Sequence, residues 1–141
     1  INEQTDDIGQ TDHKLRFDIQ PDLNMRGIEA DLGSAFQNLI INAIRYTPEQ
    51  GSIEVSWRET DNSLVFSVKD SGMGIPRRDI PRITERFYRV GRDRNRKTGG
   101  TGLGLAIVKH VLNSHDARLK ISSVLGEGSE FRCIFPLTRK V

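Results

Sequence analysis

The chain has 141 residues, of which 35% are hydrophobic and 28% are charged, as is typical of one globular domain. Its net charge of +2 gives no overall preference for nucleic acid or an anionic membrane. A single cysteine, Cys133, excludes an intramolecular disulfide, and its place in an alternating segment predicts a buried thiol. Because no run approaches the roughly 20 apolar residues of a membrane helix, we expect a soluble domain.

The first residues predict a linker followed by a strand. Residues 1–12 are polar and acidic without a sustained period, which indicates a linker or the frayed end of a preceding element. We place the start of the domain near His13. Every second residue over 15–19 is hydrophobic, which predicts a strand that Pro21 ends.

A helix and a hairpin are expected next. Residues 32–44 carry hydrophobic side chains at helical spacing, with Asp31 available as the N-cap and Pro48 as the stop. Residues 53–57 and 64–68 then alternate between hydrophobic and polar side chains on either side of a polar turn. This pattern predicts a β-hairpin.

The second half of the chain begins with a long irregular segment. Residues 71–101 are rich in Gly, Pro and Arg, with a possible short helix at 82–88. A second helix is expected at 102–115, and two last strands at 119–124 and 131–135. This order predicts an α+β fold, a two-layer α/β sandwich with helices on one face of a mixed or antiparallel sheet.

A glycine-rich stretch precedes the second helix. Residues 99–104 contain four glycines, whose uncovered backbone N–H groups lead into a helix N-terminus and so fit a phosphate. The stretch is not a P-loop, because no Lys-Ser or Lys-Thr follows, and it lacks the third glycine of a dinucleotide fingerprint. The alternative interpretation is a flexible hinge before the helix.

An acidic residue leaves the predicted hairpin. Asp70 is followed by Gly72 and Gly74, which let a carboxylate and bare backbone approach a flat ligand. A carboxylate suits an exocyclic amino group. Taken alone, ordinary turn chemistry explains this sequence equally simply.

Two asparagines share the polar face of the first predicted helix. Asn38 and Asn42 lie one turn apart, and amide oxygens suit Mg²⁺, which binds few protein groups beside substrate phosphates. Two solvated asparagines are the alternative. Arg45 and Tyr46 close the helix, where the first can meet a phosphate and the second can stack on a base.

A basic segment lies between the two glycine-rich stretches. Residues 86–97 contain five arginines and Lys97 against one acidic residue, Asp93. The segment could be a nucleic-acid loop or a solvated run of charge. Its place between two candidate nucleotide loops favours a lid over a polyanion.

Together these segments resemble the sequence boxes of the histidine-kinase ATPase superfamily. The boxes occur in that family's order, with the asparagine box at 38–48, the first glycine box at 70–75, the phenylalanine box at 85–90, the second glycine box at 99–105 and the closing pattern at 126–131. Residues 80–90 and 104–110 look most like the phosphate-sensing kinases of the family. The resemblance implies a Bergerat ATP-binding fold, with 13–141 as the catalytic domain and 1–12 as a linker or the end of a dimerisation helix.

The resemblance also implies ATP and Mg²⁺ as cofactors, with a role for individual residues. Asn42 would ligate Mg²⁺ with Asn38 supporting it, and Asp70 would bind the adenine amino group. Asn38 and Arg89 would be the catalytic positions, Arg89 lying with Tyr88 beside the phosphates. The further nucleotide-binding positions would be Tyr46 and Ile75 around the adenine, Ser129 reaching Asp70 or adenine through water, Arg45 at a phosphate, and Gly72, Gly74, Lys97, Gly100, Thr101, Gly102, Leu103, Gly104 and Leu105.

One departure from the ATPase relatives favours transfer over hydrolysis. The chaperone and gyrase types place a Glu four residues before the metal-binding Asn, where it is the general base for water. This chain has Asn38 there, and an amide takes no proton at neutral pH. None of its three histidines is followed by the pattern of a phosphoaccepting histidine; His13 reads as a strand-edge residue, and His110 and His115 as residues near a helix C-terminus, where positive charge is favourable.

The sequence therefore predicts a domain that donates the γ-phosphoryl group of Mg-ATP to a histidine on a separate dimerisation domain of the same kinase. A response regulator would then receive the phosphoryl group. The resemblance implies a monomeric fragment in the cytoplasm, belonging to a homodimeric inner-membrane sensor without a nucleic-acid partner. The alternatives are a stand-alone ATPase of the superfamily, a nucleotide-sensing regulatory module and a basic-loop nucleic-acid module.

Overall fold

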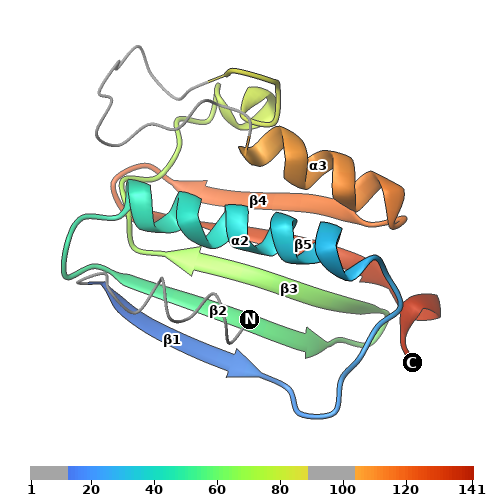
Figure 1. Cartoon of the computed structure of the whole chain (residues 1–141). Helices are drawn as coiled ribbons and strands as arrows, with labels where there is room; N and C mark the ends of the chain where they lie inside the picture. Colours follow the sequence, from blue (N-terminus) through green and yellow to red (C-terminus); the bar gives the residue numbers. More distant parts are fainter. Residues whose placement is uncertain (1–12, 89–103) are drawn as a thin grey trace.

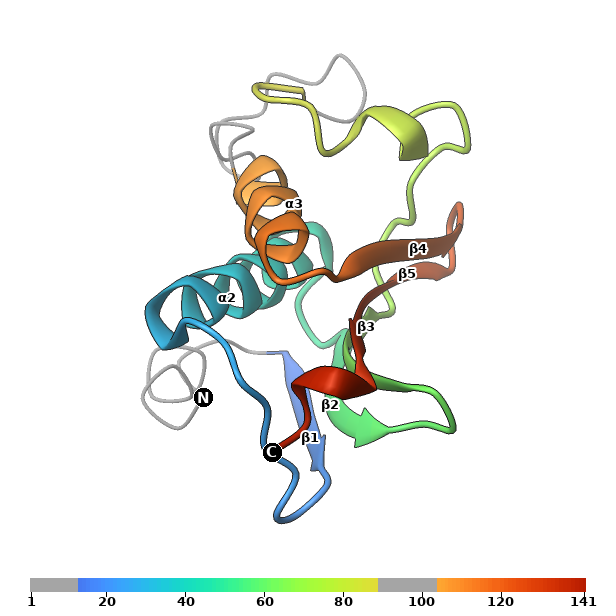
Figure 2. The same cartoon turned by 90° about the vertical axis from the view of Figure 1, so that its right-hand side faces the viewer.

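The computed structural model describes residues 13–88 and 104–141, and every structural statement below concerns these two ranges. Five strands form one sheet in the order β1-β2-β3-β5-β4, and Figures 1 and 2 show helices α2 and α3 on one face of it. The strands are β1 (Lys14–Ile19), β2 (Ser52–Glu59), β3 (Ser63–Asp70), β4 (Arg118–Val124) and β5 (Gly128–Pro136). The first pair is parallel and the other three are antiparallel. The sheet is therefore mixed, and the predicted α+β sandwich is confirmed.

Helix α2 (Glu29–Tyr46) begins earlier than its sequence pattern predicts. Asp31 lies inside the first turn instead of capping it, so the predicted N-cap was wrong. Its carboxylate still faces the partial positive charge of the helix N-terminus. The residue before the helix, Ile28, has no capping side chain, and its N–H donates to Nε2 of His115 at 3.0 Å.

His115 joins the start of α2 to the end of α3 (Gly104–Ser114). Because Nε2 accepts the Ile28 N–H, the ring proton belongs on Nδ1, which lies 2.8 Å from the carbonyl oxygen of Val111. The two ring nitrogens of His115 thus tie the start of α2 to the last turn of α3.

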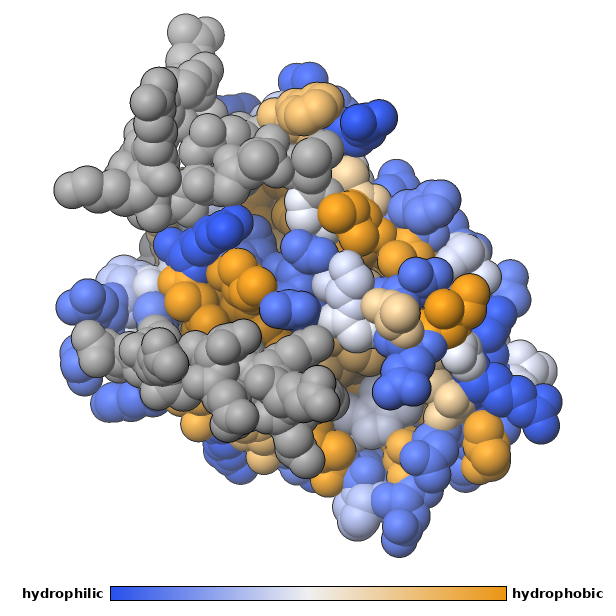
Figure 3. Space-filling model, viewed as in Figure 1, coloured by the Kyte–Doolittle hydropathy of each residue, from blue (hydrophilic) through white to orange (hydrophobic). Residues whose placement is uncertain are grey.

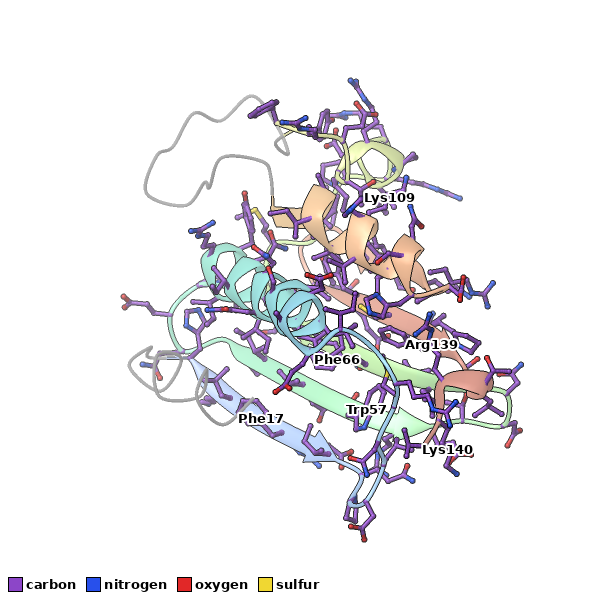
Figure 4. The ribbon with its side chains drawn as sticks, turned by 45° about the vertical axis from the view of Figure 1, so that its right-hand side comes forward. Phe17, Trp57, Phe66, Lys109, Arg139 and Lys140 are labelled. Carbon is purple, nitrogen blue, oxygen red and sulfur yellow. The ribbon has the colours of Figure 1, made fainter. Side chains whose placement is uncertain are left out.

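The core lies between the two helices and the sheet. The ring of Phe36 on α2 stacks on Phe66 of β3 with centroids 3.9 Å apart, and Figure 4 shows Phe66 between α2 and the sheet. Phe135 meets Phe36 edge-on at 6.2 Å. Cys133 is fully buried beside them, as predicted, and burial raises the pKa of its thiol to about 12.

The surface of the helical face is mixed in character. Figure 3 shows hydrophilic side chains over much of this face, with hydrophobic side chains in separate areas between them. Neither helix of the described ranges combines the length and apolar composition needed to cross a bilayer.

The segment after β3 differs from the expected helix at 82–88. Its regular part is a single 3-10 turn, η1 (Ile80–Arg82), and the chain then turns again, with Phe87 at a φ of 66°. The helix prediction was wrong because tertiary contacts hold this segment. Ile83 is buried, and the hydroxyl of Tyr88 donates to the buried carboxylate of Asp79.

Candidate functional site

Three of the predicted site residues meet where β3 ends and β5 begins. Asp70 is the last residue of β3 and pairs in register with Ser129 of β5. The chain then returns to the end of α2, where the N–H of Met73 donates to the carbonyl oxygen of Tyr46 at 3.3 Å. The structure thus brings together three predicted residues that lie far apart in the sequence.

Asp70 is held by backbone donors on one oxygen only. Its Oδ1 accepts the N–H groups of Gly72 at 2.9 Å and Ser129 at 3.3 Å. Burial raises the pKa of Asp70, and these two hydrogen bonds act in the opposite direction. Within the described ranges Oδ2 has no hydrogen-bond partner, so it is the oxygen available to an amino group of a ligand.

The backbone of Ser129 contacts Asp70 directly, and the predicted water-mediated contact of Ser129 stays a prediction. Its backbone N–H donates directly to the carboxylate, while its hydroxyl lies 2.8 Å from the Ser123 hydroxyl. The Ser123 oxygen also accepts the N–H of Ile75 at 2.7 Å. These contacts fix the half-buried Ile75 beside the start of β5. A side chain fixed in this way can form a hydrophobic wall of the site.

Gly72 and Gly74 allow the loop after Asp70 to pack closely on both sides. A Cβ at position 72 would lie 2.4 Å from the carbonyl oxygen of Tyr46. At position 74 the backbone has a φ of +75°, and a Cβ would lie 2.4 Å from the carbonyl oxygen of Val124. Any side chain at either position would displace backbone, so the loop depends on both glycines.

Asn38 contacts the N-terminus of α3. Its Nδ2 donates to the carbonyl oxygen of Ser34 at 2.8 Å, and its Oδ1 would lie 3.0 Å from a Cβ added to Gly104. Asn42 lies one turn further along α2, half-buried, and its amide bonds to no residue of the described ranges. An amide oxygen and the positive end of a helix dipole thus come together, an arrangement that suits a phosphate and a hard cation.

The remaining described residues of the predicted site occupy its edges. Arg45 is exposed in the last turn of α2, where a guanidinium can reach a phosphate. Tyr46 and Leu105 are half-buried, and Leu105 packs against the core. Their predicted roles remain predictions.

Tyr88 contacts two residues at η1, Asp79 and Arg82. Its hydroxyl donates to Asp79, which raises the pKa of Tyr88, and the guanidinium carbon of Arg82 lies 4.7 Å from the centre of its ring. A role beside the phosphates would therefore require Tyr88 to leave Asp79. Six further predicted positions lie outside the described residues: Arg89, Lys97, Gly100, Thr101, Gly102 and Leu103.

Three residues near the site were missed by the sequence patterns. Thr47 is 4% exposed, and its hydroxyl oxygen would lie 3.0 Å from a Cβ added to Gly72. Its only signal was its place directly after Tyr46. Ser123 and Asp79 carried no signal, because the partners that make them relevant are distant in the sequence or in an irregular segment.

Comparison with known proteins adds an independent line of evidence. The family model described as histidine kinase-, DNA gyrase B- and HSP90-like ATPase matches residues 27–139. The phosphate regulon sensor protein PhoR of Pseudomonas aeruginosa is 52% identical over 123 residues, which are 87% of this chain and 28% of that protein. PhoR of Haemophilus influenzae is 43% identical over 136 residues, which are 96% of this chain and 32% of that protein.

A solved structure has the same architecture. The mycobacterial sensor histidine kinase MprB superposes with a TM-score of 0.84 at 26% identity, covering 96% of this chain and 91% of that chain. The chain spans about a third of the length of the two PhoR relatives. The similarity therefore concerns only one part of each PhoR protein.

Proposed function

The chain belongs to the family of histidine kinase-, DNA gyrase B- and HSP90-like ATPases, and on that basis we propose that it binds Mg-ATP and donates the γ-phosphoryl group to a histidine. The accepting histidine lies on a separate dimerisation domain of the same sensor kinase. Similarity to two phosphate regulon sensor proteins supports a phosphate-responsive kinase. Nucleotide binding follows from the family, whereas the metal, the acceptor and the signal are our proposal.

The observation that carries phosphoryl transfer over hydrolysis is the identity and bonding of Asn38. Its Nδ2 is already committed to Ser34, and its Oδ1 faces Gly104 at the start of α3. An amide in this place can orient a phosphate or a metal-bound water, but it cannot remove a proton from water. Phosphoryl transfer needs mainly positioning and charge neutralisation, which such a site supplies.

Asn42 is the proposed ligand of Mg²⁺, with Asn38 supporting it. Within residues 13–88 and 104–141 no three His, Cys, Asp or Glu side chains gather as a metal site. A magnesium ion here would rely on the amide of Asn42, on water and on the nucleotide phosphates, which is its usual mode in phosphoryl-transfer sites. When bound, it would neutralise charge on the phosphates.

Asp70 is the proposed acceptor for the adenine amino group. Its Oδ1 is saturated by backbone donors, which leaves Oδ2 for the ligand. Tyr46 and Ile75 would enclose the base, and Arg45 and the backbone at Gly104 would meet phosphates. Arg89 and the other basic residues of the lid would complete the phosphate side.

The whole protein is proposed to act as a homodimeric inner-membrane sensor with this domain in the cytoplasm. After transfer, the phosphohistidine would serve an aspartate of a response regulator. The domain itself would be monomeric and would bind no nucleic acid.

A phosphotransfer assay tests the proposal directly. The chain is mixed with ATP labelled in the γ-phosphate and with a dimerisation domain that carries the acceptor histidine of a sensor kinase. We expect Mg²⁺-dependent labelling of that histidine, lost in Asn42→Ala because the metal ligand is removed. Asn113→Ala is the matched control, since Asn113 is exposed near the far end of α3.

Two outcomes would contradict the proposal. If the histidine stays unlabelled in every mixture while nucleotide still binds, the domain is a nucleotide-sensing module and not a kinase. If the chain alone hydrolyses ATP steadily at the rate of dedicated ATPases, Asn38 has been misjudged and the ATPase alternative holds.

A further inference from the structure

Thr47, which directly follows α2, carries a buried hydroxyl that has no hydrogen-bond partner among the described residues. Thr47 is 4% exposed, and its Oγ1 makes no hydrogen bond within the described ranges. Its backbone is satisfied separately, because Nε2 of His13 lies 2.6 Å from its carbonyl oxygen. Buried hydroxyls are nearly always hydrogen-bonded, and leaving one unpaired destabilises the fold. This hydroxyl therefore requires an explanation.

The side chain of Thr47 is oriented toward the site by its two branches. Its methyl group faces Gly51, where an added Cβ would lie only 2.3 Å away. Its hydroxyl faces Gly72 and would lie 3.0 Å from a Cβ added there. The same point is 2.9 Å from Oδ1 of Asp70, so the unpaired hydroxyl and the base-binding carboxylate border the same glycine.

We propose that Thr47 is a further base-binding residue of the site, whose hydroxyl donates to ring nitrogen N1 of adenine directly or through one water molecule. This inference rests on the proposed function, in which Asp70 accepts the adenine amino group. Adenine presents a donor and an acceptor side by side on one edge, the amino group on C6 and the neighbouring ring nitrogen N1. Asp70 supplies the matching acceptor, and Thr47 supplies the matching donor.

The rotating hydroxyl fits this role better than a purely structural one. A threonine that only filled space would lose nothing as valine, which has almost the same shape. Guanine carries a carbonyl in place of the amino group, so the Asp70 carboxylate would face an acceptor, whereas the Thr47 hydroxyl could still accept the N1–H of guanine. Discrimination between the two bases would therefore come from Asp70, and Thr47 would add affinity for the base.

The experiment compares ADP with 1-deaza-ADP, in which N1 is replaced by C–H. Calorimetry measures the binding of both ligands to the wild-type chain and to Thr47→Val. We expect Thr47→Val to bind ADP about tenfold more weakly, the effect of one lost hydrogen bond in a buried site. 1-Deaza-ADP should bind both proteins equally, because neither complex contains the bond.

Three controls separate this role from a structural one. Thr47→Ser keeps the hydroxyl and should bind ADP nearly as the wild type does. Thr138→Val makes the same chemical change in the exposed turn after β5, at the opposite end of that strand from Ser129, and should bind ADP normally. Unliganded Thr47→Val should melt at or above the wild-type temperature, because an unpaired buried hydroxyl has been removed.

The inference is overturned if Thr47→Val binds ADP as the wild type does while melting higher, since the hydroxyl is then only an unsatisfied group. It is also overturned if the wild-type chain binds 1-deaza-ADP as tightly as ADP, a result that needs no variant to fold. A wild-type chain that binds neither nucleotide would instead refute the proposed function.

Discussion

Substitution of Asp70 by asparagine is expected to affect nucleotide affinity and protein stability in opposite directions. Asparagine has the same size, and its Oδ1 can still accept the N–H groups of Gly72 and Ser129. The substitution changes the other terminal atom of the side chain, because an NH₂ group replaces the free Oδ2. A donor then faces the donor of the adenine amino group.

The loss of affinity can be estimated from the bond that is removed. A hydrogen bond to a charged group contributes about 1.5 to 3 kcal/mol. The affinity for ADP should therefore fall by about 10- to 150-fold. The repulsion between two facing donors adds to this loss, so the upper part of the range is expected.

The effect on stability follows from the raised pKa of Asp70. Burial raises this pKa above its ordinary value of 3.8, so the folded state holds the proton more tightly than the unfolded state. Below the ordinary value both states are protonated and the fold bears no penalty. As the pH rises through the raised folded-state pKa, the penalty for a buried carboxylate develops fully. At pH 7 unliganded Asp70→Asn should therefore melt at or above the wild-type temperature.

Calorimetry with ADP and thermal unfolding at pH 7 and pH 4 measure both effects. Asp61→Asn is the matched control, because Asp61 is exposed in the turn between β2 and β3. Normal ADP binding by Asp70→Asn would refute the role of Asp70 in base recognition. At each pH the melting temperature of the wild type is subtracted from that of Asp70→Asn. A smaller difference at pH 7 than at pH 4 would refute the sign of the electrostatic argument.

Three further predictions concern α3 and the core. Gly104→Ala should push the Asn38 side chain aside, because its Cβ would lie 3.0 Å from Oδ1, and should lower the phosphotransfer rate while the melting temperature stays near that of the wild type. Phe66→Ala should lower the free energy of unfolding by about 3 to 5 kcal/mol, measured in urea, because it removes a fully buried ring stacked on Phe36. Cys133 should react with a thiol reagent at pH 8 only when denaturant unfolds the chain, because burial raises the pKa of its thiol to about 12. Rapid labelling of the folded protein would contradict this and show that β5 opens.

The strands and the helices were predictable because their side-chain periodicity is local and regular. Alternating hydrophobic residues predicted strands at 15–19 and 53–57, and the structure extends these to Lys14–Ile19 and Ser52–Glu59. The start of α2 was not predictable from Asp31, because the first N–H of this region is satisfied by His115 from 87 residues away. Tertiary contacts of this kind override local capping signals.

The order of the sequence boxes named Asp70, Asn38 and Gly104 as site residues, and this membership stays a prediction. Nothing in the sequence paired Asp70 with Ser129 through the backbone. That contact depends on the register between β3 and β5, which only the folded sheet defines. The unpaired hydroxyl of Thr47 could not be predicted either, because the lack of a hydrogen-bond partner leaves no pattern in the sequence.

The two sides of the proposed site, a base side at Asp70 and a metal side at Asn42, differ in how far they are organised before a ligand binds. On the base side, backbone N–H groups fix Asp70, and these groups are themselves held by the pairing of β3 with β5. Because these groups are already in place, little conformational entropy is lost when a base binds there. Almost all of the interaction free energy therefore contributes to affinity. On the metal side the amide of Asn42 bonds to no described residue, and its geometry must be set by the ligand itself. The base side should therefore govern affinity for ADP and ATP alike, whereas the metal side should govern how much Mg²⁺ adds to the binding of each.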